Sequence, residues 1–199
     1  MSWINWPNRI TLTRIVLIAP LVICLLNLNA GWVGWRYLSG GLLSVMILSD
    51  AVDGFLARRL DQVTSLGRFL DPLADKLLIT ATVILLSIEA TAIPGFRLPS
   101  WVPVVVVGKD LLTVLGFVLV YTTTGRLLIQ PRIWGKACTA VQLLMVLYCL
   151  FVPDVVVRHA HTVLEALYWS AAALAVIALA DYIRLASRFS AHHASGRRG

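Results

Sequence analysis

Six apolar stretches of about twenty residues occupy most of this 199-residue chain. Hydrophobic residues make up 59% of it and charged residues only 14%, which is too apolar for a soluble domain of this size. About twenty apolar residues suffice to cross a bilayer as a helix. We therefore predict an all-α integral membrane protein with six transmembrane helices and a short N-terminal interfacial segment. The predicted spans are Arg9–Leu28, Tyr37–Leu56, Phe69–Ala90, Trp101–Tyr121, Ile133–Val152 and Val163–Ser187.

These six spans leave little room for a second domain. We predict one membrane domain over residues 1–190 and a disordered tail over residues 191–199. The three cysteines, Cys24, Cys138 and Cys149, lie singly in apolar stretches, and we interpret them as packing residues.

The positive charges are distributed unevenly between the two sides of the predicted helices. An even number of spans puts both termini on one side, together with thirteen lysines and arginines; three lie opposite, and Lys109 lies within a span, which accounts for all 17. This bias predicts an inner or plasma membrane protein with both termini and its aspartate-rich loop in the cytoplasm. The net charge of +7 then suits an anionic lipid surface, and we predict no nucleic-acid partner.

Four aspartates form the predicted functional centre: Asp50, Asp53, Asp71 and Asp75. Spacings of three and four residues place each pair on one side of its own helix. If the helices bring the pairs together, two bare carboxylates ~4 Å apart would repel by roughly 4 kcal/mol at an effective dielectric constant near 20, so a cation must lie between them. Neither His nor Cys occurs in this segment, which favours Mg²⁺ or Mn²⁺ over zinc.

The residues beside the aspartates suit a phosphate ligand. Gly54 removes a side chain next to Asp53, so a ligand can approach the backbone, and Ala57 continues the same smooth surface one turn later. Arg58 adds a fixed cation that is suited to phosphate.

The whole segment from Asp50 to Asp75 resembles the signature of the CDP-alcohol phosphotransferase family, also called the class I CDP-alcohol phosphatidyltransferases. It matches the pattern D-x2-D-G-x2-A-R-x8-G-x3-D-x3-D at all eight fixed positions. The resemblance implies transfer of a phosphatidyl or similar group from a CDP-linked donor such as CDP-diacylglycerol to an alcohol, with release of CMP. It also implies a homodimer with a cytoplasm-facing active site.

The resemblance further implies a role for each matching position. Two divalent ions would be held by the four aspartates, and Asp75 would also be the catalytic base. The CDP portion would be bound by Gly54, Ala57, Arg58 and Gly67.

Other segments narrow the acceptor alcohol. The opening Asn5-Trp-Pro-Asn-Arg-Ile-Thr-Leu-Thr-Arg14 is similar to the N-P-N-x-x-T-x-x-R start of bacterial phosphatidylglycerophosphate synthases and related cardiolipin synthases, and the stretch from Asp71 to Lys76 is similar to their D-P-x-A-D-K segment. We therefore favour glycerol 3-phosphate as the acceptor, with phosphatidylglycerol, and thus cardiolipin synthesis, as the alternative.

A cationic pocket would suit the dianion of glycerol 3-phosphate. Its candidate residues are Lys109, Arg126, Arg132 and Lys136. The positive-inside bias explains the last three equally well. Lys109 and Asp110 stand where these synthases have Arg-Glu or Arg-Asp; inside a span the two residues should either pair or face the active site.

A different class of function, a divalent cation transporter, would also use intramembrane aspartates. Its acidic residues should lie at mid-membrane, often in broken or repeated helices. Here the aspartates are predicted at the cytoplasmic ends of two helices, beside Gly54 and Arg58, which favours a site for nucleotide phosphates.

Overall fold

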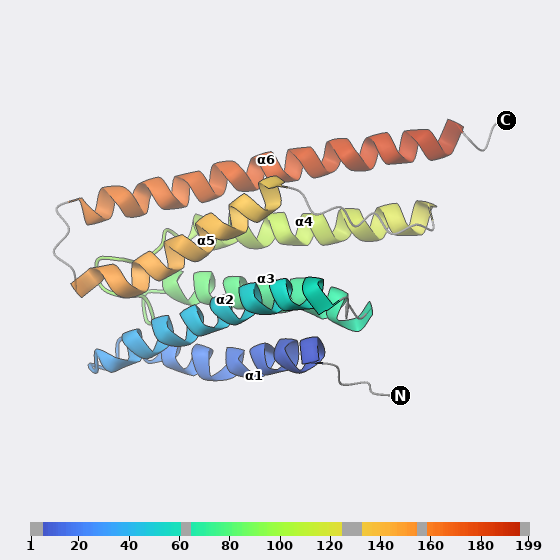
Figure 1. Cartoon of the computed structure of the whole chain (residues 1–199). Coiled ribbons are helices and arrows are strands. Elements are labelled where there is room, and N and C mark those ends of the chain that lie inside the picture. Colours follow the sequence, from blue (N-terminus) through green and yellow to red (C-terminus); the bar gives the residue numbers. More distant parts are fainter. Residues whose placement is uncertain (1–5, 61–64, 125–132, 155–158, 196–199) are drawn as a thin grey trace. The chain divides into compact units, whose positions relative to one another are not determined.

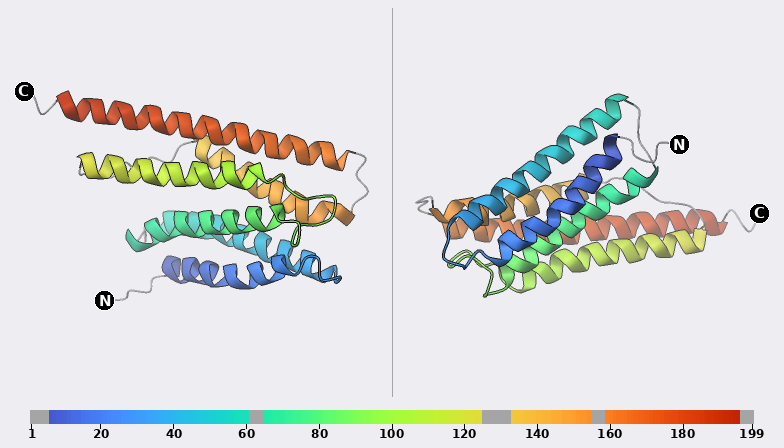
Figure 2. Two further views of the ribbon diagram at one scale, coloured as in Figure 1. Left: turned by 180° about the vertical axis from the view of Figure 1, so that it is seen from behind. Right: turned by 90° about the horizontal axis from the view of Figure 1, so that it is seen from below.

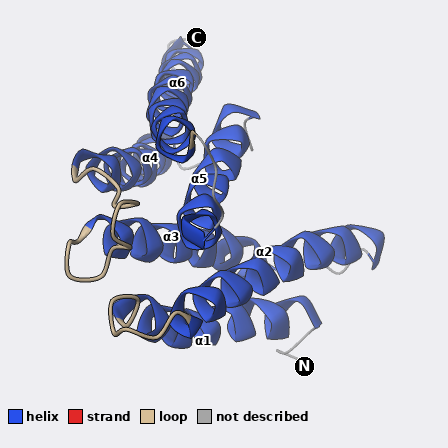
Figure 3. Ribbon diagram, turned by 90° about the vertical axis from the view of Figure 1, so that its left-hand side faces the viewer, coloured by secondary structure: helices blue, strands red, loops and turns tan. Residues whose placement is uncertain are grey.

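The computed structural model describes residues 6–60, 65–124, 133–154 and 159–195. In this part of the chain the regular elements are all helices, and there is no strand (Figures 1 and 3). Side chains are described for fewer residues, and the largest omissions are residues 6–12, 51–73, 123–124 and 185–195. The all-α prediction is confirmed. The helices are α1 (Trp6–Leu26), α2 (Gly34–Leu60), α3 (Ser65–Ser87), α4 (Trp101–Thr124), α5 (Ile133–Phe151), the short 3₁₀ helix η1 (Val152–Asp154) and α6 (Ala160–Ser195).

The six long helices correspond to the six apolar stretches, but several extend beyond them. α2 continues to Leu60, α3 already begins at Ser65, and α6 continues to Ser195. Polar residues at a helix end can lie outside the hydrocarbon core, so a search for apolar residues alone stops too early. The predicted tail is thus helical over its first five residues, 191–195. An interfacial segment was predicted before Arg9; its residues 6–8 belong to α1, and residues 1–5 lie outside the described residues.

The chain divides into two compact units. Unit 1 comprises Met1–Pro99 and Val146–His161, and unit 2 comprises Ser100–Met145 and Thr162–Gly199. The division falls within α5, so neither unit is a continuous piece of sequence.

In unit 1, α1 packs against both α2 and α3 (Figure 2). Arg14 of α1 contacts Asp75 of α3, and Asn29, just after α1, donates hydrogen bonds to the backbone oxygens of Glu89 and Ala90, just after α3. α1 and α3 therefore run in the same direction. The apolar core of this unit includes the fully buried side chains Leu21, Leu25, Leu43, Met46, Val83 and Leu86.

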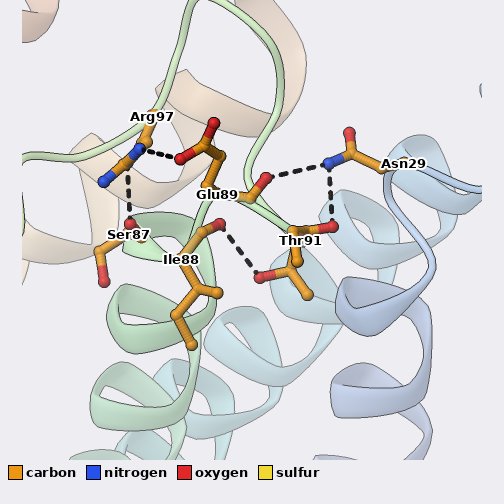
Figure 4. A network of polar contacts seen from close by, with 7 residues as sticks. Asn29, Ser87, Ile88, Glu89, Thr91 and Arg97 are labelled. Atoms are coloured by element: carbon orange, nitrogen blue, oxygen red, sulfur yellow. Dashed lines mark hydrogen bonds and ion pairs between the residues drawn. The ribbon is translucent and has the colours of Figure 1, made fainter.

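The segment after α3 folds back against the helix ends in a network of polar contacts (Figure 4). Arg97 donates to the backbone oxygen of Ser87 at 3.1 Å and forms an ion pair with Glu89, also at 3.1 Å. Gly95 supplies a positive φ of 79°, which a residue with a side chain rarely adopts. Leu98 is fully buried and donates its backbone N–H to Leu86, so this end of the unit is closed by backbone as well as side chains.

In unit 2, α4 and α6 also run in the same direction. Near the start of α4, Trp101 packs edge-on against Tyr168 of α6, with ring centroids 5.6 Å apart. Farther along both helices, Gly116 lies so close to the Tyr182 ring that an added Cβ would come within 2.6 Å of it. Small residues allow this close approach of membrane helices. Ala171 and Ala175 of α6 are buried within the chain.

Large apolar side chains are exposed on helices of both units. They include Val16, Leu48, Val104, Ile133 and Val176, each more than 60% exposed. Exposed apolar residues along helices are expected where lipid replaces water. Among the described residues, two segments are long and apolar enough to cross a membrane, Ile133–Phe151 and Ala160–Arg184.

Candidate active site

The buried guanidinium of Arg14 connects two of the four predicted aspartates. Its Nη2 atom lies 2.6 Å from Oδ1 of Asp50 on α2, and its Nη1 atom lies 3.2 Å from Oδ1 of Asp75 on α3. One arginine of α1 thus brings together carboxylates from two other helices, 25 positions apart in the sequence.

These three residues lie at a similar depth from the ends of their helices. Arg14 is eight residues into α1, Asp75 is ten residues into α3, and Asp50 is ten residues before the end of α2. At 1.5 Å per residue, each lies about 12–15 Å from that helix end. The ion pairs therefore form two to three turns from these ends, deeper along the helices than the end positions predicted from the sequence.

The two carboxylates and the arginine differ in their access to solvent. The Arg14 side chain is only 3% exposed, whereas Asp50 is 43% exposed and Asp75 40%. Arg14 therefore contacts the aspartates from the protein interior. The accessible part of each carboxylate is left for a ligand that arrives from outside.

The other residues of the signature are placed by backbone only. Asp53, Gly54, Ala57 and Arg58 lie in α2, and Gly67 and Asp71 lie in α3. The helical spacing on which the prediction of paired aspartates rests is therefore present in both helices. The side chains of these six residues lie outside the described set.

The residues present fit a hard divalent cation. Aspartate oxygens are the ligands that Mg²⁺ and Mn²⁺ prefer, and no His or Cys lies in the segment from Asp50 to Asp75. Among the side chains that the structure describes, no group of three or more His, Cys, Asp or Glu could hold a metal ion. Asp53 and Asp71 lie outside that set, so the predicted cluster of four is not tested.

The predicted acceptor residues are only partly described. Lys109 of α4 forms an ion pair with its neighbour Asp110 at 3.0 Å, and its Nζ atom lies 3.9 Å from the Sγ atom of Cys138 on α5. The Sγ atom in turn lies 3.8 Å from the backbone oxygen of Ala171 on α6. Lys109 thus points into the packing of three helices of unit 2, and of the two predicted outcomes the pairing with Asp110 is present.

Among the described residues, no contact links Lys109 to another predicted acceptor residue. Lys136 lies in the first turn of α5 with an exposed side chain, while Cys138, two residues later, is buried. Arg126 and Arg132 lie outside the described residues. The three cysteines are buried and free, as the prediction of packing residues requires.

Arg14 was not among the residues predicted for the site. In the sequence it contributes to the positive charge of one side and to the N-terminal motif. A signal was nevertheless present, because Arg14 lies within an apolar stretch, and a buried arginine in a membrane helix needs an acidic partner. The paired aspartates were therefore the acidic partners that could have been proposed for Arg14.

Comparison with known proteins places the chain in a family. Residues 4–177 match the CDP-alcohol phosphatidyltransferase family. Three similar proteins bear the same name, CDP-diacylglycerol–glycerol-3-phosphate 3-phosphatidyltransferase. The one from Bacillus subtilis (strain 168) is 36% identical over 71% of this chain and 74% of its own length. That from Aquifex aeolicus (strain VF5) is 30% identical over 68% and 69%, and that from Salmonella choleraesuis (strain SC-B67) 27% identical over 92% and 94%.

The helical membrane fold and the eight-position signature on α2 and α3 define a class of phosphotransferases that act on CDP-linked donors. The chain belongs to the CDP-alcohol phosphatidyltransferase family, and it is a transferase of phospholipid biosynthesis. The resemblance seen in the sequence is thereby confirmed. Membership of this family also favours phosphotransfer over the cation-transporter alternative.

Proposed function

We propose that this protein transfers the phosphatidyl group of CDP-diacylglycerol to glycerol 3-phosphate, giving phosphatidylglycerol phosphate and CMP. The observation that carries the proposal is a relative of that name that matches 92% of the chain, including the second half, where the acceptor residues were predicted. Further relatives of the same name, up to 42% identical, support it.

In this proposal Asp50, Asp53, Asp71 and Asp75 hold two divalent ions, Mg²⁺ or Mn²⁺. Such ions, when bound, neutralise the pyrophosphate and stabilise the CMP leaving group. Asp75 also accepts the proton of the acceptor hydroxyl as that oxygen attacks phosphorus. The partial exposure of Asp50 and Asp75 supports these roles, because both carboxylates can be reached from outside the helices.

The CDP portion of the donor is assigned to Gly54, Ala57, Arg58 and Gly67, and the acceptor to Arg126, Arg132 and Lys136 with Lys109. For the first group the support is the match to the family signature. For Lys109 the support is weaker, because its described contacts are Asp110 and Cys138.

We further propose that all six long helices cross the membrane, with the termini and the aspartates on the cytoplasmic side, and that the enzyme is a homodimer. The directions of the helices support six crossings, because α1 runs with α3 and α4 runs with α6, as alternate spans must. The excess of lysine and arginine on the side of the termini supports the orientation.

The test is CMP release by the purified protein in detergent, with CDP-diacylglycerol, Mg²⁺ and one of two acceptors. We expect turnover with glycerol 3-phosphate and phosphatidylglycerol phosphate as the lipid product. Turnover with phosphatidylglycerol alone would instead identify a cardiolipin synthase. Release with neither acceptor would refute both assignments and leave only the family.

A further inference from the structure

We propose that Arg14 is a positioning residue for the metal site: it holds Asp50 and Asp75 from the protein interior so that their accessible oxygens face an incoming divalent cation. The inference rests on the proposed function, since it takes these two aspartates as metal ligands. It concerns a residue outside the eight-position signature, on a third helix.

The contacts make Arg14 a bridge between the two aspartates. Its two terminal nitrogens each reach a different carboxylate, at 2.6 Å and 3.2 Å. The planar guanidinium fixes the distance between these nitrogens, so it also limits the spacing of the two carboxylate oxygens. A lysine has one nitrogen and could not reproduce this geometry.

The difference in burial shows on which side Arg14 acts. Arg14 is almost fully buried, while both carboxylates are about two-fifths exposed. A cation that arrives from solvent therefore meets the aspartates, with Arg14 behind them. Carboxylates that bind metals are commonly held by such outer contacts, and the loss of one typically costs about 10- to 100-fold in metal affinity or activity.

The opposite expectation is that the Arg14 guanidinium competes with the metal ion for the two carboxylates. A guanidinium close to two ligand oxygens lowers the negative charge that attracts a dication. If that effect dominated, removal of Arg14 would strengthen metal binding. The position of Arg14 behind the exposed carboxylates favours orientation over competition, and the two effects change the affinity in opposite directions.

The experiment measures Mn²⁺ binding to the full-length protein in detergent by electron paramagnetic resonance, with and without CDP-diacylglycerol and without any acceptor. The test variant is Arg14→Gln. The matched control is Arg97→Gln, which removes the same charge from an arginine of the same unit that pairs with exposed Glu89. Asp75→Asn identifies the signal that belongs to the aspartate site.

We expect Arg14→Gln to bind Mn²⁺ about 10- to 100-fold more weakly and Arg97→Gln to bind as the wild type does. Arg14→Lys should lie between, because it keeps the charge but loses the bridge. With Mg²⁺, the concentration needed for half-maximal CMP release should rise by a similar factor in Arg14→Gln.

Several results would overturn the inference: unchanged or tighter Mn²⁺ binding in Arg14→Gln, a lower melting temperature without a change in affinity, or a wild-type protein whose Mn²⁺ binding does not depend on Asp75. If Arg14→Gln does not fold, wild-type affinity in Arg14→Lys would overturn it too. Because the Mn²⁺ binding measurements contain no acceptor, a failure of the proposed acceptor would leave their comparison intact.

Discussion

Each unit of the molecule contains a cation of low solvent exposure paired with aspartate, but the two arrangements are built differently. Arg14 in unit 1 pairs with Asp50 and Asp75, which come from two other helices. Lys109 in unit 2 pairs with Asp110, its neighbour in the sequence. The first pairing requires that three helices assemble correctly, whereas the second can form within α4 alone.

Solvent access separates the two sites further. Asp50 and Asp75 are about two-fifths exposed, but Lys109 and Asp110 are only 10% and 14% exposed. A charged pair with little exposure to solvent is compensated mainly by charges and dipoles of the protein around it. Carboxylates that stay accessible beside a buried arginine can still bind a ligand, so we assign the chemistry to unit 1.

The largest effect should follow Asp75→Asn. The amide keeps the size of the side chain but cannot accept the acceptor's proton, and it is a poorer metal ligand. We expect CMP release to fall by about 10²- to 10⁴-fold while the protein remains folded. The control is Glu89→Gln, an exposed acid at the other end of α3, which should keep full activity. Substantial turnover by Asp75→Asn would remove this residue from the base role.

Replacing Lys109 should affect stability before activity. Lys109→Met leaves Asp110 without its neighbouring cation, and breaking a buried pair on one side typically costs about 3 kcal/mol in the free energy of unfolding. The double variant Lys109→Met/Asp110→Leu should recover most of that loss. The measurement is thermal unfolding in detergent, followed by the KM for glycerol 3-phosphate.

This pair of variants also tests the acceptor assignment. If Lys109 only neutralises Asp110, the double variant should have a near wild-type KM for glycerol 3-phosphate. A KM that rises in both variants would show that Lys109 binds the acceptor despite its contacts with Asp110 and Cys138.

These two pairings also show which contacts could be predicted from the sequence and which could not. The pairing of Lys109 with Asp110 was one of two predicted outcomes, because opposite charges inside an apolar stretch either pair or face the active site. The spacing of the aspartates placed each pair on one side of its own helix, and the resemblance to the family implied that Asp50 and Asp75 belong to one site. That Arg14 lies between them could not be derived from spacing, because the contact depends on how α1 packs against α2 and α3.

The helices show a similar limit. Apolar stretches predicted all six long helices, since membrane helices need about twenty such residues. The ends of α2, α3 and α6 were missed because Leu60, Ser65 and Ser195 lie beyond apolar segments, in polar sequence. Hydropathy reports the lipid environment, and a helix can continue after that environment ends.

A smaller effect is expected for the energetic coupling of Arg14 and Asp50. We predict a coupling of about 1 kcal/mol in a double-mutant cycle of Arg14→Gln and Asp50→Asn, measured by thermal unfolding without divalent metal. The exposure of the Asp50 carboxylate keeps the value modest. Purely additive effects would mean that the ion pair contributes nothing to the packing of α1 against α2.

The smallest effect should come from the ion pair at the opposite end of unit 1. Arg97 is 47% exposed and Glu89 is 87% exposed, so solvent screens their attraction. We expect Glu89→Ala to lower stability by less than about 1 kcal/mol, with unchanged CMP release. Arg97→Ala should cost somewhat more, because Arg97 also donates to the backbone oxygen of Ser87. If Glu89→Ala lowered CMP release as much as Asp75→Asn does, the turn after α3 would have to affect the active site. The contrast between the two ends of unit 1 would then be wrong.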